Sequence, residues 1–184
     1  LENAETKEEK DFLSAACEGL LSAKKISGKF ADTAEEMLKS DPQNENLKRI
    51  AESARRSPWE KPQNFYEALN TYAFMRKVIG SLEGVGPNSF GRIDMDLYPF
   101  YEADITSGAI TREEAYELIS TFLIIFDCHY DHNKEMVGYA DHELECTYVL
   151  GGCDADGKPI YNELTKMFLD ATYEEKIIFP KIKC

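Results

Sequence analysis

The sequence predicts a mainly helical fold with a small α/β portion, in which a helical array is followed by one or two short strands. Apolar residues recur at three- and four-residue steps over about the first 130 residues, the period of an amphipathic helix. Capping boxes at Asn64 and Thr111 mark two helix starts. Near residue 145 the pattern changes to a short β-branched and aromatic run that ends at two glycines.

Residues 1–62 are expected to form the helical array. Gly28 is predicted to end a first helix, and Asp41 with Pro42 to open a third, because aspartate caps helices and proline suits the first helical position. Two prolines in RRSPWEKP, 55–62, then predict a linker. The residues expected to face a core are Phe12, Ala15, Ala16, Gly19 and Leu20, then Phe30, Ala34, Met37 and Leu38, then Leu47, Ile50, Ala51 and Ala54.

Residues 63–144 are expected to hold two long helices separated by a polar loop. The first helix should run from about 64 to 82. Glycines and Pro87 then predict an irregular loop that leads into an S-x-G-R-x-D motif. Thr111 with Glu114 begins the second, most apolar helix. Its core-facing residues should be Ala115, Leu118, Ile119, Phe122, Leu123 and Phe126.

Residues 145–184 are predicted to form a strand, a helix and a second strand. The run ECTYVLGG reads as the first strand, helical spacing returns from about 160 to 173, and IIFPKIKC could be the second strand. Pro180 limits that strand to a sheet edge or a strand start. We interpret the three segments as one partial domain covering 1–184, because an isolated strand pair is marginally stable by itself.

The composition excludes several classes of partner. The 34 acidic and 21 basic residues give a net charge of -13, which repels phosphate backbones and anionic lipid headgroups. Neither a nucleic acid nor a membrane is therefore expected as a partner, and the longest apolar run is too short to span a bilayer. Without a signal pattern, and with an odd number of cysteines, the chain is expected to be cytoplasmic with reduced thiols. The five cysteines are Cys17, Cys128, Cys146, Cys153 and Cys184.

The stretch GGCDADGKPIYNEL, 151–164, poses a choice between a calcium loop and a turn. With Gly157 at the sixth position of an EF-hand loop, Asp154, Asp156 and Glu163 fall on ligand positions, but the first position is Gly152. The alternative is a tight turn between a strand and a helix. In that interpretation Gly151, Gly152, Asp154 and Asp156 shape the backbone and Asn162 caps the helix.

Two further polar clusters leave alternatives open. His129 and His132, three residues apart, could share a metal ion on one helix face, although no metal is expected in this chain. Arg92 and Asp94 follow a glycine turn in NSFGRIDMDLYPFYEADI, 88–105. A structural clamp is favoured for this pair because a guanidinium can bind several oxygens, and an anion-binding site is the alternative.

At this cluster the chain resembles the glycyl radical enzymes of the pyruvate formate-lyase-like family. Six elements match in order, and together they extend over most of the chain. They are P-x-N-F-Y-E-A-L at 62–69, S-F-G-R-I-D at 89–94, L-Y-P-F-Y-E-A-D at 97–104, G-A-I-T-R-E-E-A at 108–115, V-L-G-G-C-D-A-D-G at 149–157 and N-E-L at 162–164.

The resemblance implies a ten-stranded α/β barrel made of two half-barrels surrounded by helices. It also implies a radical stored on a glycine, a cysteine that becomes a thiyl radical, and a separate activase that uses S-adenosylmethionine and an iron–sulfur cluster. A barrel interior suits this chemistry because it excludes water. Within this chain no residue is expected to be catalytic, since neither an R-V-x-G-Y string nor a G-C-V-E-like string occurs.

The resemblance therefore implies an internal fragment of an anaerobic lyase or transferase, inactive alone, that contributes scaffold and a pocket wall. Relatives that dehydrate diols carry a His-Ser pair where this chain has Gly86 and Pro87, which argues against a diol substrate. Asn88, Ser89 and Arg92 are the residues expected to face the pocket. Expected partners are the remainder of the polypeptide, the activase and, through exposed strands, a second copy. The alternative is a stand-alone helical interaction module without catalysis.

Overall fold

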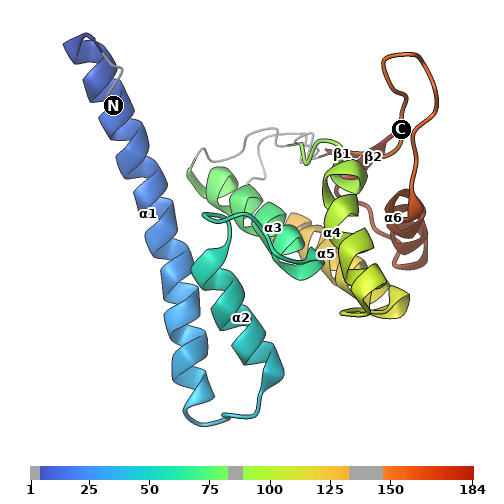
Figure 1. Ribbon diagram of the computed structural model, residues 1–184, viewed down its shortest axis with the longest axis horizontal. Helices are drawn as coiled ribbons and strands as arrows, with labels where there is room; N and C mark the ends of the chain where they lie inside the picture. The colour runs from blue at the N-terminus through green and yellow to red at the C-terminus, as the bar shows by residue number, and fades with distance from the viewer. Residues whose placement is uncertain (1–4, 83–88, 133–146) are drawn as a thin grey trace. The chain divides into compact units, whose positions relative to one another are not determined.

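The computed structural model describes residues 5–82, 89–132 and 147–184 of the chain. The chain divides into two compact units, which we call unit 1 (Leu1–Lys61) and unit 2 (Pro62–Cys184). Among the described residues, helices predominate and two short strands form one sheet (Figure 1). The prediction of a mainly helical fold with a small α/β portion is confirmed. The single partial domain stays a prediction.

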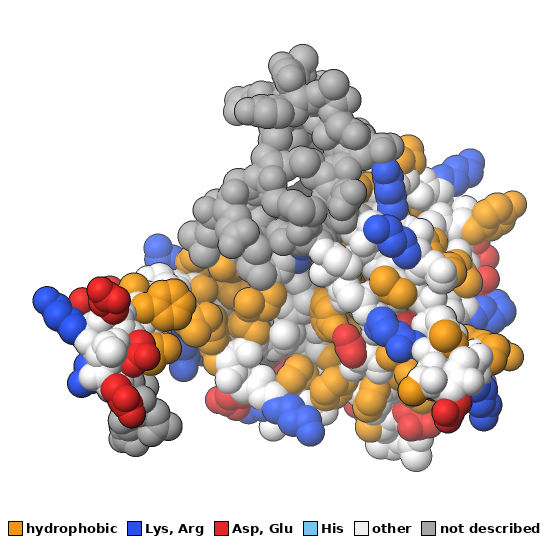
Figure 2. Space-filling view, turned by 90° about the horizontal axis from the view of Figure 1, so that it is seen from above, with side chains coloured by type: hydrophobic (Ala, Val, Ile, Leu, Met, Phe, Trp, Pro, Cys, Tyr) orange, Lys and Arg blue, Asp and Glu red, His pale blue; other side chains and the backbone are white. Residues whose placement is uncertain are grey.

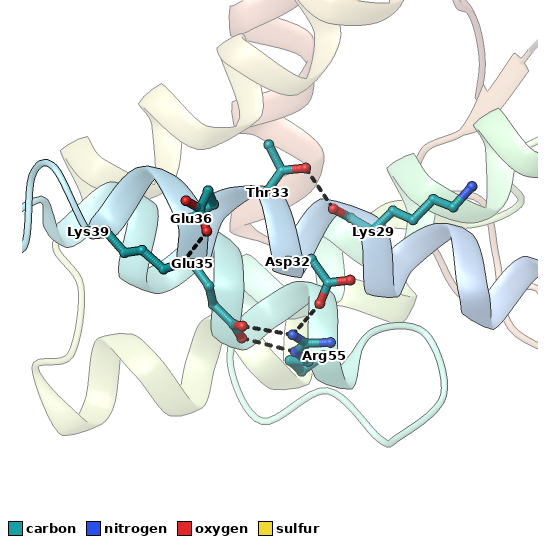
Figure 3. Close-up of polar contacts among 7 residues, drawn as sticks. All are labelled: Lys29, Asp32, Thr33, Glu35, Glu36, Lys39 and Arg55. Carbon is teal, nitrogen blue, oxygen red and sulfur yellow. Dashed lines mark hydrogen bonds and ion pairs between the residues drawn. The ribbon is translucent and has the colours of Figure 1, made fainter.

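Unit 1 is a pair of helices. Helix α1 (Lys7–Leu38) begins at Thr6, whose side chain forms a capping box with Glu9. Helix α2 (Glu45–Arg56) is much shorter and packs against α1. Arg55 of α2 donates to both carboxylate oxygens of Glu35 and to Asp32 on α1 (Figure 3). The indole N–H of Trp59 donates to the buried hydroxyl of Ser27 at 2.9 Å.

Two boundary predictions in unit 1 are wrong. The helix continues through Gly28. A single interior glycine costs only about 1 kcal/mol relative to alanine, which the surrounding helical hydrogen bonds and packing outweigh. Helix α2 is capped by Asn44, which accepts from the amide of Leu47. Asp41 instead accepts a hydrogen bond from the Asn44 side chain, and Pro42 lies in the turn between the helices.

The predicted apolar stripe of α1 is mostly not buried. Phe12, Leu20, Phe30 and Met37 are exposed by 72%, 59%, 59% and 53%. Ala34 is buried as expected, while Ile50 of the predicted third stripe is exposed. The buried positions of α1 are small side chains, which let α2 approach closely. They are Ala23, Ser27, Ala31 and Ala34.

Unit 2 is built from four helices and two strands among the described residues. Helices α3 (Phe65–Leu82) and α5 (Arg112–His132) begin at the predicted caps, with Thr111 and Glu114 exchanging backbone hydrogen bonds. Helix α4 (Ile93–Ser107), which the sequence analysis did not assign, contains Pro99. Ala115, Ile119, Phe122, Leu123 and Phe126 of α5 are buried as predicted, and Leu118 is half-buried.

The strand, helix and strand predicted near the end of the sequence are present. Strand β1 (Thr147–Val149) and strand β2 (Lys181–Lys183) pair in parallel, with Tyr148 opposite Ile182. Helix α6 (Glu163–Glu174) connects them, as a parallel pair requires. Pro180 precedes β2, as its lack of an N–H predicts.

The core of unit 2 joins these elements. Its largest fully buried side chains include Tyr148, Phe168, Phe65 and Leu123. Phe90, from the loop before α4, contacts the rings of Phe122 and Phe126 on α5. Figure 2 shows one face of the molecule, on which hydrophobic side chains lie between charged ones. Within the described residues, no helix meets the length and hydropathy needed to cross a membrane.

Candidate functional site at the Arg92–Asp94 cluster

Residues 89–91 lie along one edge of β1. The amide of Phe90 donates to the carbonyl of Thr147 at 2.7 Å, and the amide of Val149 donates to the carbonyl of Gly91 at 2.8 Å. The next amide of the chain, that of Leu150, donates to Lys183 of β2 at 2.8 Å. Because successive amides of a strand point to opposite edges, the S-F-G-R segment and β2 flank β1 on its two sides.

Arg92 and Asp94 both bind the backbone of Gly151, where β1 ends. The Arg92 guanidinium donates to the carbonyl of Gly151 at 2.8 Å, and the amide of Gly151 donates to Asp94 Oδ2 at 2.7 Å. The two residues therefore use both polar groups of one peptide residue 57 to 59 positions away. This double contact fixes the start of α4 to the carboxyl end of β1.

The same carboxylate holds the start of α6. The hydroxyl of Thr165 donates to Asp94 Oδ2 at 2.6 Å. Asn162 caps α6 by accepting from the amide of Thr165, and its side-chain amide donates to the backbone carbonyl of Asp94 at 3.0 Å. Asp94 thus connects three segments, α4, the turn after β1, and the start of α6.

Asp94 is completely buried, and its second oxygen, Oδ1, has no hydrogen-bond partner among the described residues. A buried carboxylate is costly unless it is hydrogen bonded or paired. Oδ2 accepts two hydrogen bonds, and Asp94 lies in the first turn of α4, where the helix dipole favours a negative charge. Loss of this carboxylate would leave the buried Gly151 amide without an acceptor and the Thr165 hydroxyl with only the longer contact to Asn162 Oδ1, at 3.4 Å.

Two glycines after β1 allow the chain to pass close to this cluster. Gly151 and Gly152 have φ angles of 65° and 99°, which side-chain-bearing residues rarely adopt. A Cβ atom on Gly151 would lie 3.3 Å from the carbonyl oxygen of Ile160, and one on Gly152 would lie 3.6 Å from the Arg92 guanidinium. Both conformation and space therefore favour glycine at 151.

The stretch after Gly152 forms a turn. The Asp154 carboxylate accepts from the amides of Asp156 and Lys158, and Gly157 has a φ angle of 77°. Cys153 and Pro159 pair as an antiparallel bridge across the turn. The Asp154 side chain is thus occupied by its own loop, while Asp156 lies exposed. This geometry is the Asx-type turn of the second interpretation.

Of the other candidate residues, only some lie within the part of the chain that the structure describes. Asn88 lies outside the described residues, as do the side chains of His129 and His132. Ser89 is exposed, but its hydroxyl donates to the carbonyl of Thr147 and accepts from the amide of Gly91. Across the described ranges, no group of three or more His, Cys, Asp or Glu side chains is placed to hold a metal ion.

The sequence analysis missed three polar residues that hold this region. Thr165 contacts Asp94, as described. Asp104 accepts from the amide of Phe65 at 2.8 Å, and Asp127 accepts from the amides of Ile178 and Phe179 before β2. The three-residue spacing of Asn162 and Thr165 is a capping signal that could have identified Thr165. Asp104 and Asp127 bind residues 39 or more positions away, for which the sequence carries no local signal.

Burial raises the pKa of two tyrosine side chains in unit 2. Tyr148 lies fully buried on β1, and burial raises the pKa of its phenol to about 12. Its hydroxyl is 2.6 Å from that of Thr172 on α6. Burial also raises the pKa of Tyr72, whose hydroxyl donates to Asp96 on α4. Neither phenol ionises near neutral pH, so both act as hydrogen-bonding groups.

A parallel strand pair connected by a helix and surrounded by further helices is the building unit of an α/β barrel. The family model of pyruvate formate lyase-like proteins matches residues 1–184. The chain belongs to this family.

Known relatives agree with this assignment. The chain is 28% identical over 184 residues to (2S)-3-sulfopropanediol dehydratase of Klebsiella oxytoca, covering 94% of this chain and 22% of the relative. It is 31% identical over 161 residues to indoleacetate decarboxylase of Tractidigestivibacter scatoligenes, covering 85% and 18%. A crystal structure of a glycyl radical enzyme from Archaeoglobus fulgidus superposes with a TM-score of 0.72 at 29% identity, covering 87% of this chain and 21% of that one.

These matches also identify the larger fold to which the strand pair belongs. The solved structures are glycyl radical enzymes with the α/β barrel fold, so the β1–β2 pair and its helices are part of such a barrel. The chain spans about a fifth of the length of the relatives that it matches.

Proposed function

We propose that this chain builds helical scaffold and one wall of the substrate pocket in a glycyl radical enzyme that cleaves a C–C, C–O or C–N bond. The observation that carries the proposal is the family match over residues 1–184, combined with coverage of only 22% of a relative's length. A match over the whole chain supports a shared fold, and the short coverage supports a larger parent polypeptide. The parent would be an anaerobic, cytoplasmic lyase or transferase.

The position of the Arg92–Asp94 cluster supports the pocket-wall role. It lies at the carboxyl ends of two parallel strands, where α/β proteins bind their ligands. Arg92 is only half-buried, whereas Asp94 is completely buried. In this proposal Asp94 fixes the backbone, while Arg92 and Ser89, with Asn88 before them, form the polar part of the wall.

The radical chemistry is assigned to the remainder of the parent polypeptide. The sequence contains neither an R-V-x-G-Y string nor a G-C-V-E-like string, which supports placing the radical glycine and the thiyl cysteine there. The glycyl radical would be installed by a separate activase with S-adenosylmethionine and an iron–sulfur cluster. This chain would then position the substrate and exclude water, without itself holding the radical.

Electron paramagnetic resonance tests the proposal. The chain alone and the complete parent would each be incubated anaerobically with the activase and S-adenosylmethionine. We expect a glycyl radical signal from the parent and none from the chain. A signal from the chain alone would contradict the assignment of the radical glycine to the remainder of the parent polypeptide. A natural reading frame that stops after Cys184 would instead favour the stand-alone interaction module.

A substitution in the complete parent tests the pocket wall. Arg92→Lys keeps the positive charge but loses the planar fork of the guanidinium. We expect a rise in KM of about tenfold or more with radical content unchanged, since tenfold corresponds to about 1.4 kcal/mol. Lys158→Arg, in the exposed turn, serves as the control and should leave KM unchanged. An unaltered KM for Arg92→Lys would show that Arg92 does not contribute to the wall of the substrate pocket.

A further inference from the structure

One face of α1 is uncharged along most of the helix. At 3.6 residues per turn, Phe12, Ile26, Phe30 and Met37 fall within about 40° of one another around the helix axis. They extend over about 37 Å along the axis. No charged residue interrupts this face between its two ends. We call it the α1 stripe, and its members are Phe12, Ala15, Gly19, Ala23, Ile26, Phe30, Thr33 and Met37.

Apart from Ala23, which is buried, the α1 stripe lies outside the face that α2 covers. The residues of α1 that are buried lie mainly on the adjacent face, and the first of them along the chain is Ala23. The large residues of the stripe remain exposed by 72% at Phe12, 40% at Ile26, 59% at Phe30 and 53% at Met37. An uncharged surface with four large apolar side chains in line is the pattern of an interface.

Gly19 is a second, independent feature of the stripe. Glycine weakens a helix interior, and the space where its Cβ would lie is open, with nothing within 4 Å. No close contact within this structure therefore requires glycine there. A small residue in the middle of an apolar stripe permits the backbone of a partner to approach closely.

We infer that the α1 stripe docks against an apolar segment of the parent polypeptide outside this chain. The length of the relatives supports this occupant, because relatives that match the chain are about five times longer and supply the additional polypeptide. The net charge of -13 disfavours a second copy, since two chains of the same sign repel each other. The inference rests on the proposed function, because it needs a larger parent.

Co-purification tests the docking surface. The tagged 184-residue chain and the remainder of the parent would be produced together as two polypeptides, and the amount of remainder bound would be measured. The double variant Phe12→Glu/Phe30→Glu places two carboxylates in the stripe. We expect it to reduce the recovered remainder at least tenfold, while the circular dichroism of the chain stays unchanged because both side chains are exposed.

Ser14→Glu/Cys17→Glu is the matched control. Both positions are exposed on α1 but lie outside the stripe, so this variant should retain the remainder. Equal recovery with both double variants would overturn the inference. Sedimentation in which the chain alone is a dimer that Phe12→Glu/Phe30→Glu dissociates would assign the stripe to a second copy and also overturn it. The radical signal of the complete parent is measured separately, so failure of the proposed function is distinguishable from failure of this surface.

Discussion

Unit 1 and unit 2 bury different kinds of side chain. Every buried residue that the structure describes in unit 1 is an alanine or a serine. Unit 2 buries phenylalanine, tyrosine, isoleucine and leucine from α3, α4, α5, α6 and β1. Unit 2 therefore has a hydrophobic core of its own, whereas unit 1 exposes most of its large apolar side chains. The comparison teaches that a helix can be amphipathic although its large apolar side chains are not covered within its own unit.

The largest contrast should come from truncating an aromatic residue in each unit. Phe168 is completely buried against Tyr148, with ring centroids 5.6 Å apart, whereas Phe12 is 72% exposed. We expect Phe168→Ala to lower the free energy of unfolding of unit 2 by about 3–5 kcal/mol, and Phe12→Ala to change stability by about 0.5 kcal/mol or less. Urea unfolding followed by fluorescence and circular dichroism measures both. Comparable losses would contradict the difference between the units.

Asp94→Ala should give the next largest effect. It leaves the buried Gly151 amide without an acceptor and the Thr165 hydroxyl with only the 3.4 Å contact to Asn162 Oδ1, at a cost of about 3 kcal/mol. Asp96→Ala, two residues along the same helix, removes an exposed carboxylate that accepts from Tyr72 and should cost less than half as much. Thermal unfolding of the Asp94→Ala and Asp96→Ala variants measures the two losses of stability. An Asp94→Ala variant as stable as Asp96→Ala would show that the cluster does not hold unit 2 together.

The sequence predicted the helices of unit 2 better than their long-range connections. The capping boxes at Asn64 and Thr111 are local signals, and both mark helix starts in the structure. The partners of Asp94 lie 57 and 71 residues away, so spacing could not identify them. Asp41 was a plausible cap by composition, but Asn44 is the residue that meets the amide of Leu47.

The α1 stripe shows a different reason for failure. Periodicity correctly identified Phe12 and Phe30 as residues of an apolar face, but it carries no information about whether the partner is present. The sequence predicted the apolar face, and only the structure could show that these side chains are exposed in unit 1.

A smaller effect is expected from Gly151→Ala. The left-handed conformation costs an alanine about 1 kcal/mol, and the added Cβ would also crowd the Ile160 carbonyl at 3.3 Å. Gly157→Ala carries the same conformational cost without a neighbour within 4 Å. Gly151→Ala should therefore have the lower melting temperature of the two. A lower melting temperature for Gly157→Ala would show that the close contact to the Ile160 carbonyl does not make position 151 the more sensitive one.

The smallest effect concerns alkaline pH. Burial raises the pKa of Tyr148 to about 12, above the ordinary value of about 10. The folded state therefore holds the proton more tightly than the unfolded state. Its contribution to stability is complete below pH 10 and is lost as the pH rises toward 12. Tyr148→Phe should flatten the decline in the unfolding free energy of unit 2 between these values. An unchanged slope would assign the decline to other groups.

Hydrogen–deuterium exchange of the backbone amides tests the central claim most directly, by comparing this chain alone with the complete parent. In the chain alone, we expect residues 7–22 of α1 to exchange rapidly, because none of them is buried, while the amides of α5 around Ile119 and Leu123 are protected. In the parent, residues 7–22 should become protected, with α5 little changed. Equal and strong protection of residues 7–22 in both samples would contradict the claim that this face is completed from outside the chain.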